Sequence, residues 1–369
     1  MIKSIIITDI AIWVSGAGHI ARLKALIKFL IKYTYVTVVF LGKKPDAPID
    51  HLLPPKVTLI FLDNENQNDK ERNLLLIRKL FEFEPYKICF IEYIHHSFYL
   101  QCVPDNVVTV LDAHDIISER NKSFNSFQYD CWDYPLQRER EYKIYKLYDY
   151  VMFISKKDFE ISLNDLDPSR MIIAPHPAVT FEHELKEIPK SIGFVASDYL
   201  PNVDSINWFL KNVWINIPAE LNVTLNIYGA VCRKIPNSLV TQNVCLKGYQ
   251  NNLLQIYSEI DIAINPVRIG SGLKIKNMEA LANGIPLLTT IHGASGLEEG
   301  IDYAFMVADN ETQYAEKLIN LIQNYQLRLT LSKNASNWIK AEFSEEKCFA
   351  KLKELITPIN VNNTPMYSY

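Results

Sequence analysis

The chain has 369 residues, of which 48% are hydrophobic and 22% are charged, a balance typical of soluble globular proteins. This length exceeds that of most domains built around one hydrophobic core, so we expect two domains of similar size. The formal net charge of −4 excludes a general electrostatic attraction to nucleic acid or to anionic membranes. The six cysteines are widely spaced without a C-x-x-C pair, which favours reduced thiols over a disulfide framework or a metal site.

The amino-terminal residues, Met1 to Val14, form an apolar run that Asp9 interrupts. No convincing cleavage signature follows this run, so it predicts a buried parallel strand rather than a signal peptide. No apolar stretch in the sequence is long enough to span a membrane. We therefore expect a cytoplasmic protein.

Apolar strands alternate with helical patterns along the whole chain. In the first half we expect strands at about 4–10, 36–41, 57–61, 87–91, 107–111 and 150–154, and helices at about 19–33, 69–83, 137–147 and 156–164. In the second half we expect strands at about 191–195, 222–228, 243–246, 260–264, 286–289 and 304–307, and helices at about 203–215, 250–258, 273–283, 311–324 and 326–341. Uninterrupted apolar strands separated by helices are typical of parallel sheets covered on both faces, so the fold class is α/β.

This pattern occurs twice, which predicts two doubly wound, Rossmann-like domains that bind ligands at the carboxyl ends of their strands. The linker is expected between Pro175 and Pro189, a polar segment with three prolines. We expect an N-terminal domain at 1–185, a C-terminal domain at 186–343, and a final helix at 344–358. Residues 359–369 are expected to form a loose tail.

The most informative stretch, Asn265 to Thr290, reads as strand, turn, helix and strand. Gly270 and Gly272 flank the turn that opens the helix, where backbone N–H groups can approach an anion and the helix dipole favours negative charge. Three neighbouring cations can pair with a phosphate: Arg268, Lys274 and Lys276. Glu279, about two turns into the helix, can accept hydrogen bonds from sugar hydroxyls. The stretch therefore predicts a nucleotide-sugar site.

This stretch resembles the donor-binding core of glycosyltransferase family 4, the glycosyl transferases of group 1, which are retaining enzymes with a GT-B fold. The family string reads G-x-G-x-K-x-K-x-x-E-A-x-A-x-G-x-P, followed by a Gly-Ala-x-Gly turn. The matching residues are Gly270, Gly272, Lys274, Lys276, Glu279, Ala280, Ala282, Gly284, Pro286, Gly293, Ala294 and Gly296. Further matches at 193–210, Gly229 and 247–249 make the resemblance strong over residues 190–300 and weaker over the first half.

The resemblance implies two Rossmann-like domains that face each other across a cleft, with the terminal helix crossing back to the first domain. It implies transfer of a sugar from a nucleotide-diphosphate-sugar donor to an acceptor hydroxyl, with retention and without a metal or other cofactor. The acceptor would be a glycan, a lipid-linked molecule or a protein, in bacterial cell-surface polysaccharide or glycoconjugate synthesis. No nucleic acid is expected as a partner, and membrane contact would be weak and peripheral, at the inner face.

The resemblance also assigns roles to residues of the second domain. The nucleotide base would lie beside Tyr249, and Glu279 would bind the ribose. The diphosphate would be held by Arg268, Gly272, Leu273 and Lys274. Gly270, Ser271 and Lys276 complete the expected donor site, and His114, Lys274 and Arg268 are the expected catalytic residues.

Two departures from the family pattern concern the same site. Many members carry a second glutamate eight positions before the one that matches Glu279, and Ser271 stands there in this chain. Many members also place an Arg and a Lys after the first strand of the second domain, whereas Ala196 to Asn202 contains no cation. The phosphate charge would therefore fall on Arg268, on the two lysines or on the helix terminus alone.

Two segments of the first half offer further site residues. The turn from Ser15 to Arg22 carries Gly16 and Gly18 at the start of a helix, and we expect it at the cleft floor near the donor; an ordinary strand-to-helix turn is the alternative.

At the tip of the strand that ends at Leu111, Asp112 and Asp115 are expected on the acceptor side, flanking a functional His114. The resemblance places a functional histidine at the end of this strand. The alternative is that the two acids only cap the next helix.

Other patterns are given structural interpretations. His95 and His96 adjoin a strand, whose successive side chains point to opposite faces, so we expect no zinc site there. Asp165 and Asp167 form a D-x-D pattern in a turn context, which we interpret as solvated. The mixed charges of 137–146 favour a salt-bridged solvent face over a membrane contact.

Two other function classes remain open. One is a nucleotide-sugar epimerase with the same architecture, which would act on the donor alone. The other is a non-catalytic relative that supports a partner enzyme, which the two departures from the family pattern would permit.

Overall fold

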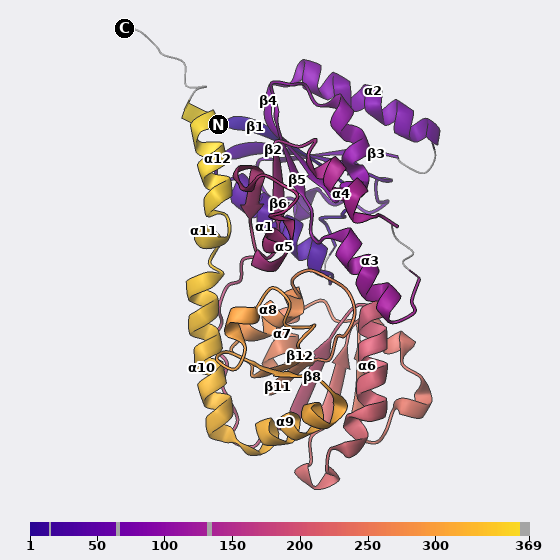
Figure 1. The fold of residues 1–369 in the computed structure, drawn as a ribbon, viewed down its shortest axis with the longest axis vertical. Coiled ribbons are helices and arrows are strands. Elements are labelled where there is room, and N and C mark those ends of the chain that lie inside the picture. The colour runs from indigo at the N-terminus through magenta and orange to yellow at the C-terminus, as the bar shows by residue number, and fades with distance from the viewer. Residues whose placement is uncertain (15, 64–66, 131–134, 362–369) are drawn as a thin grey trace.

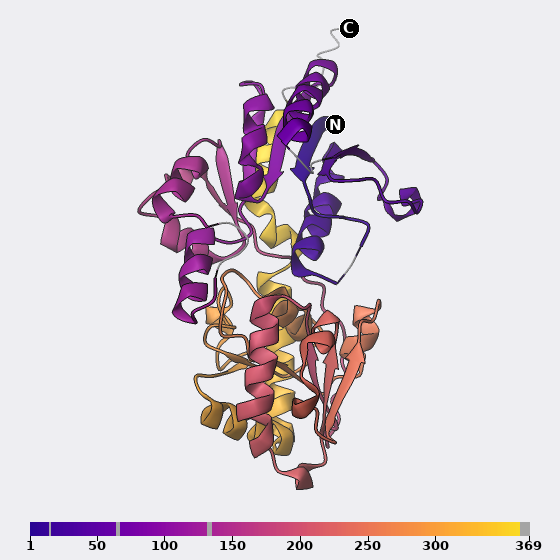
Figure 2. The same cartoon turned by 90° about the vertical axis from the view of Figure 1, so that its right-hand side faces the viewer.

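A computed structural model of the chain describes residues 1–14, 16–63, 67–130 and 135–361 (Figure 1). Two parallel sheets form the centres of two domains that lie one above the other along the long axis (Figure 2). This arrangement confirms the α/β prediction of two doubly wound units.

The sheet of the N-terminal domain has seven strands in the order β3-β2-β1-β4-β5-β6-β7, and all of its pairings are parallel. The strands are β1 (Ile2–Thr8), β2 (Thr34–Leu41), β3 (Val57–Leu62), β4 (Tyr86–Glu92), β5 (Val108–Asp112), β6 (Tyr150–Phe153) and β7 (Met171–Ile173). We did not predict β7, which has three residues and therefore little periodicity of its own.

The sheet of the C-terminal domain has six strands in the order β10-β9-β8-β11-β12-β13, again parallel throughout. The strands are β8 (Ser191–Val195), β9 (Thr224–Tyr228), β10 (Val244–Gly248), β11 (Ile262–Asn265), β12 (Leu287–Thr290) and β13 (Met306–Ala308). In each sheet the strand order reverses once. The reversal lies between β1 and β4 in the first sheet and between β8 and β11 in the second. Ligands of doubly wound sheets bind at such switch points.

Helices cover both faces of each sheet (Figure 1). Their bounds are α1 (Gly18–Leu30), α2 (Gln67–Phe83), α3 (Ile117–Ser126), α4 (Arg138–Tyr145), α5 (Lys156–Ser162), α6 (Leu200–Asn212), α7 (Leu253–Ser258), α8 (Ile275–Ala282), α9 (Glu311–Gln323), α10 (Tyr325–Glu342), α11 (Glu345–Cys348) and α12 (Ala350–Val361). The bounds of α3 were not predicted, because its polar sequence lacks a helical apolar stripe. Among the described residues, no helix combines the length and the apolar character needed to cross a bilayer.

The apolar strands pack between helices as their sequence predicts. Ile5, Ile7 and Leu111 are buried on one face of the first sheet, whereas Ile6 and Val110 are buried on the other. Alternate residues of a strand thus enter separate cores, which requires apolar residues at every position. The second sheet also has a hydrophobic cluster on each face.

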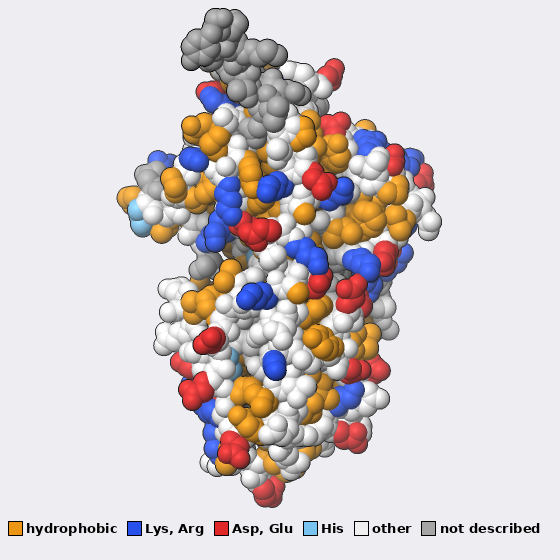
Figure 3. Space-filling view, turned by 90° about the vertical axis from the view of Figure 1, so that its left-hand side faces the viewer, with side chains coloured by type: hydrophobic (Ala, Val, Ile, Leu, Met, Phe, Trp, Pro, Cys, Tyr) orange, Lys and Arg blue, Asp and Glu red, His pale blue; other side chains and the backbone are white. Residues whose placement is uncertain are grey.

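The charged pattern at 137–146 forms α4, and several of its charges form ion pairs. Arg138 contacts Asp165 at 2.7 Å and Glu119 at 3.2 Å, and Lys143 contacts Glu139 at 2.7 Å. Of the two aspartates in the D-x-D pattern, Asp165 thus pairs with an arginine, and Asp167 accepts a hydrogen bond from the backbone N–H of Ser169. Basic and acidic side chains are also interspersed on the face that carries α10 to α12 (Figure 3).

The final helices cross from the C-terminal domain to the N-terminal one (Figure 1). The predicted helix at 344–358 divides into α11 and α12, and α12 extends to Val361, into the segment expected as a tail; residues 362–369 lie outside the described part. Phe349 packs on Phe29 with ring centroids 4.8 Å apart. Leu352 and Ile356 are completely buried in the core beneath α1. The last helix is therefore part of the core of the first domain.

A Leu352→Ala substitution should lower the free energy of unfolding by about 2–5 kcal/mol, because it leaves a cavity in this core. Urea denaturation followed by tryptophan fluorescence measures the change. Lys351→Ala is the matched control, since its side chain is 69% exposed and pairs with the exposed Glu354 on the surface. Equal small effects of both substitutions would contradict the burial of Leu352.

Candidate active site

The carboxyl ends of both sheets face a cleft between the domains. The cleft contains two adjoining cavities of about 510 Å³ and about 640 Å³. Both are lined by Asp115 from the first domain and by Ser271 and Lys274 from the second. Their sizes lie in the range of small-molecule sites, roughly 300–1,000 Å³.

Most of the predicted site residues line the 510 Å³ cavity. It is lined by Gly16, Gly18, His114, Asp115, Tyr249, Ser271, Gly272, Leu273, Lys274, Lys276 and Glu279. Gly270 lines the second cavity instead. Ser15, at the start of the first glycine turn, lies outside the described residues.

The glycine turn after β11 lies directly against the first domain. Gly272 has a φ of +68°, and a Cβ atom there would lie 3.1 Å from the Cβ of Asp115 and 3.3 Å from the carbonyl oxygen of His114. A side chain would therefore be strained and crowded at once. Glycine permits this contact, which places the predicted donor motif beside the tip of β5.

A buried polar network holds the turn in place. The side chain of Asn277 on α8 donates to the carbonyl of Gly293 at 2.9 Å, and it accepts a hydrogen bond from the side-chain amide of Asn265 at 2.7 Å. Thr289 on β12 donates to the carbonyl of Asn265 at 2.7 Å. These bonds tie the end of β11 to α8 and β12, so the start of α8 is fixed relative to the cleft.

Two lysines lie at the start of α8. Nζ of Lys274 donates to the carbonyls of Ser271 and Gly272 at 2.9 and 2.8 Å, and burial lowers its pKa to about 8. Nζ of Lys276 donates to Asn202 at 2.5 Å and lies 4.9 Å from the centre of the Phe194 ring. Burial, and secondly the charge of Lys274, lower the pKa of Lys276 to about 7. An anion bound between them would favour the charged form of both lysines.

Glu279 lies one turn beyond Lys276 on α8 and lines the same cavity. Its carboxylate accepts a hydrogen bond from the hydroxyl of Tyr257 at 2.8 Å, and burial raises its pKa. The carboxylate is therefore oriented by a neighbour.

The glycine turn of the first domain packs against Tyr249 and Ile275 of the second domain. A Cβ atom on Gly16, where φ is +103°, would lie 3.0 Å from Cε2 of Tyr249. Gly18 begins α1, and a Cβ atom there would lie 3.2 Å from Cδ1 of Ile275 on α8. The Tyr249 side chain is otherwise 55% exposed, which leaves ring surface available for stacking.

His114 occupies a strained position at the tip of β5, with a φ of +58°. Its Nε2 lies 2.7 Å from Oε2 of Glu92, which is completely buried at the end of β4. Its ring stacks on Tyr93 with centroids 4.0 Å apart and an interplanar angle of 17°. Burial, and secondly the charge of Asp112, raise the pKa of Glu92. A carboxyl group and an aromatic ring thus fix the orientation of the imidazole.

Asp112 does not lie in the cleft, contrary to the expected acceptor-side role. It is completely buried and receives three hydrogen bonds of 2.7–3.1 Å from Arg22. The same guanidinium donates to the carbonyl of Ala174 at 2.8 Å. Asp112 is therefore a structural link between β5, α1 and the segment after β7, because its carboxylate is already occupied.

Asp115, by contrast, lines both cavities. Its Oδ2 accepts a hydrogen bond from the hydroxyl of Ser271 and lies 3.5 Å from Nη1 of Arg120. Its Oδ1 is buried and has no hydrogen-bond partner among the described residues. A buried acceptor without a donor is costly, so this oxygen is suited to a ligand hydroxyl.

Arg268 also lies away from the expected position. Its Nη2 contacts Oδ2 of Asp204 at 2.8 Å, and its guanidinium lies over the rings of Phe127 and Trp208 at 5.1 and 4.9 Å. It lines neither of the two cavities. The structure therefore does not support the phosphate-binding role expected for Arg268, because Asp204 already neutralises its charge.

Several residues of the site were not predicted from the sequence. They are the partners that orient the predicted groups: Glu92 for His114, Asn202 for Lys276, Tyr257 for Glu279, and Arg120 beside Asp115. Only Glu92 carries a signal in the sequence, as the acid at the end of the apolar strand β4. The others follow from contacts between distant segments.

Residues 189–324, which include the predicted donor motif, match the family model described as glycosyl transferases group 1. The chain is also 23% identical over 302 residues to a Klebsiella pneumoniae protein described as an uncharacterized 44.6 kDa protein in the cps region, with 77% of each chain covered.

Solved structures resemble the whole chain. Anabaena HepE in complex with UDP and glucose superimposes with a TM-score of 0.72 at 12% identity, covering 96% of this chain and 99% of that one. WaaG, described as a glycosyltransferase involved in lipopolysaccharide biosynthesis, superimposes with a TM-score of 0.67 at 16% identity, covering 96% and 99%. At such identities the likeness shows the fold, and it confirms the predicted GT-B architecture.

The buried pair beneath the site should be strongly coupled. Asp112→Asn should cost about 3–5 kcal/mol of unfolding free energy, because the Arg22 guanidinium would remain buried without its counter-charge. The double variant Arg22→Met with Asp112→Leu should cost less than this single substitution, since both charges are removed together. Urea denaturation measures both free energies of unfolding, and a double variant at least as destabilised as Asp112→Asn would contradict the prediction.

Proposed function

We propose that this chain is a retaining, metal-independent glycosyltransferase that moves a sugar from a nucleotide-diphosphate-sugar to an acceptor hydroxyl. The observation that carries the proposal is the pair Lys274 and Lys276, which line the cavity beside Gly272 where α8 begins. The match of residues 189–324 to glycosyl transferases group 1 covers this motif and supports the reaction class.

The diphosphate would lie against the turn from Gly270 to Lys274. Negative charge grows on the leaving diphosphate as the glycosidic bond breaks, and fixed cations and backbone N–H groups stabilise that charge without rearranging. No acidic side chain of a metal-binding type is required at this position, because the lysines supply the charge. Retention of the anomeric configuration is proposed from the resemblance of residues 270–286 to the retaining family.

The nucleoside would extend from this turn toward Glu279 and Tyr249. Tyr257 orients the Glu279 carboxylate, which would accept hydrogen bonds from the ribose hydroxyls. The exposed ring of Tyr249 would stack on the base above Gly16. Base, ribose and diphosphate would then occupy one continuous side of the cavity.

The transferred sugar would contact the first domain. His114, held by Glu92 and Tyr93, would hydrogen-bond a sugar hydroxyl or orient the acceptor. Asp115 would supply the carboxylate that the second domain lacks at Ser271, because the two side chains are hydrogen-bonded and Asp115 Oδ1 has no donor among the described residues. A carboxylate would thus reach the sugar from the opposite side of the cleft.

The biological setting is proposed to be the synthesis of bacterial cell-surface polysaccharide or glycoconjugate. Support comes from the similarity to the Klebsiella pneumoniae protein of the cps region and from the fold shared with WaaG. The acceptor would be a glycan, a lipid-linked molecule or a protein, and any membrane contact would be peripheral, at the inner face. Product analysis in the absence of acceptor distinguishes this transferase from an epimerase, which would convert the donor alone.

Donor binding provides the first test. Uridine, guanosine and adenosine diphosphates are titrated by calorimetry, and the tightest binder is used with Lys274→Ala and Glu279→Ala. Lys274→Ala should weaken binding about ten- to hundred-fold, because a charge-assisted hydrogen bond contributes about 1.5–3 kcal/mol. Lys333→Ala, which removes an exposed lysine of α10, is the matched control. Unchanged binding in both site variants, with unchanged melting temperature, would rule out the assigned site.

The lysine pKa values also predict a pH dependence. A bound diphosphate raises both lysine pKa values, so binding takes up protons. Donor affinity should be highest well below pH 7 and should fall as the pH rises through 7 and 8, where the free lysines deprotonate. UDP-, GDP- or ADP-glucose is the suitable probe, because its diphosphate diester does not titrate between about pH 6 and 9. Calorimetry in buffers of different ionisation enthalpy measures the uptake, and a constant affinity across this range would contradict it.

A further inference from the structure

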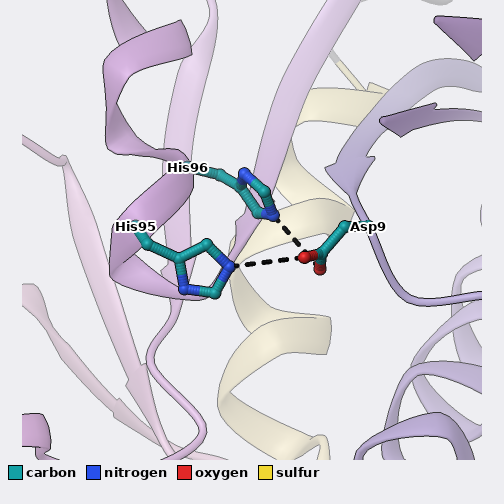
Figure 4. A group of neighbouring side chains, drawn as sticks. All are labelled: Asp9, His95 and His96. Carbon is teal, nitrogen blue, oxygen red and sulfur yellow. Dashed lines mark ion pairs between the residues drawn. The ribbon is translucent and has the colours of Figure 1, made fainter. Parts of the chain in front are cut away.

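Three potential metal ligands meet at the carboxyl ends of β1 and β4. Asp9 directly follows β1, and His95 and His96 lie in the short 3-10 helix Ile94–Cys102 that follows β4. Figure 4 shows that both imidazole rings point toward the Asp9 carboxylate. The sequence-based exclusion of zinc was wrong in its premise, because it assumed strand geometry for the two histidines. On a tight helical turn, adjacent side chains can converge on one point.

The distances between these groups suit a single small cation. Nε2 of His96 lies 3.1 Å from Oδ1 of Asp9, and Nε2 of His95 lies 3.6 Å from Oδ2. One ligand atom from each of the three residues can be chosen so that all lie within 4.8 Å of one another. Bonds of about 2.0–2.1 Å in tetrahedral geometry separate two ligand atoms by about 3.3 Å. The two distances from the histidine nitrogens to the Asp9 oxygens, 3.1 and 3.6 Å, lie on either side of that value.

His96 lies within ion-pair distance of Asp9 but without the alignment of a hydrogen bond. The residue is only 5% exposed, and its Nε2 has no hydrogen-bond partner among the described residues despite the nearby carboxylate. A neutral imidazole can present a lone pair to a metal ion. The buried nitrogen therefore has the properties of a ligand.

The surrounding structure orients the rings and leaves a route for an ion. Tyr93 stacks on His95 with centroids 5.2 Å apart and an interplanar angle of 20°. The Asp9 and His95 side chains are 45% and 33% exposed, so an ion and a water molecule can approach from solvent. His95 also lines the 640 Å³ cavity, which places this cluster at the edge of the cleft.

A second cluster with similar residues does not qualify. Glu92, Asp112 and His114 also lie within ligand distance of one another. However, Arg22 donates three hydrogen bonds to the Asp112 carboxylate and brings its own positive charge. A cation would be repelled there.

We propose that Asp9, His95 and His96 bind a divalent transition-metal ion of the zinc class, with one coordination position left open beside the cleft. Two imidazoles and one carboxylate are the ligand set that such ions favour over calcium or magnesium. The ion is separate from the diphosphate site at α8, so the proposal does not depend on the proposed transferase activity.

Cobalt titration of the full-length, tag-free, chelator-treated protein tests the site. One equivalent of Co²⁺ should produce visible absorption bands of low-symmetry four- or five-coordinate cobalt, and Zn²⁺ should displace it. Asp9→Asn and His95→Ala should each weaken binding at least about ten-fold, a loss of about 1.4 kcal/mol. Both residues are partly exposed, so these variants should fold. His51→Ala, which removes an exposed histidine elsewhere in the same domain, is the control.

The variants distinguish metal binding at this site from metal binding elsewhere on the protein. Binding lost in Asp9→Asn and His95→Ala but kept in His51→Ala supports the site, as does a rise in melting temperature with Zn²⁺ that occurs only when the three ligands are present. Absence of one-to-one binding in the wild-type chain overturns it. Binding that persists unchanged in both ligand variants also overturns it, because the ion would then occupy other groups.

Discussion

The close contact between Gly272 and the backbone of His114 and Asp115 is the constraint on which the site depends. It brings the start of α8 to the tip of β5, so that groups from both domains line the same two cavities. Any side chain at position 272 would separate these surfaces. The hydrogen bond from Ser271 to Asp115 is possible only because the turn approaches this closely.

The regular part of the fold could be predicted because its causes are local. Apolar strands buried on both faces and the fixed spacing from Gly270 to Glu279 are visible in the sequence itself. The bounds of α3 and the strand β7 were missed because the first lacks an apolar stripe and the second has three residues. Neither gives a pattern that periodicity can detect.

The site could be predicted only where a residue's role does not depend on a distant partner. Asp112 and Arg268 have the right charge and position in the sequence, but Arg22 and Asp204 already neutralise them. Those partners lie 90 and 64 positions away along the chain. The pair His95 and His96 shows the same limit, since its geometry depends on a helical turn that follows the strand. Charge and spacing identify candidates, whereas pairing decides which of them remain available.

The passage of α12 into the first domain affects how the protein is made. Phe349, Leu352 and Ile356 complete a core whose other members include β1 and α1, the first elements to be synthesised. Domains generally fold as units during translation, beginning from the amino terminus. Here the amino-terminal half exposes an incomplete apolar surface until Phe349, Leu352 and Ile356 have left the ribosome. Chaperone binding to nascent chains should therefore persist until α12 has emerged.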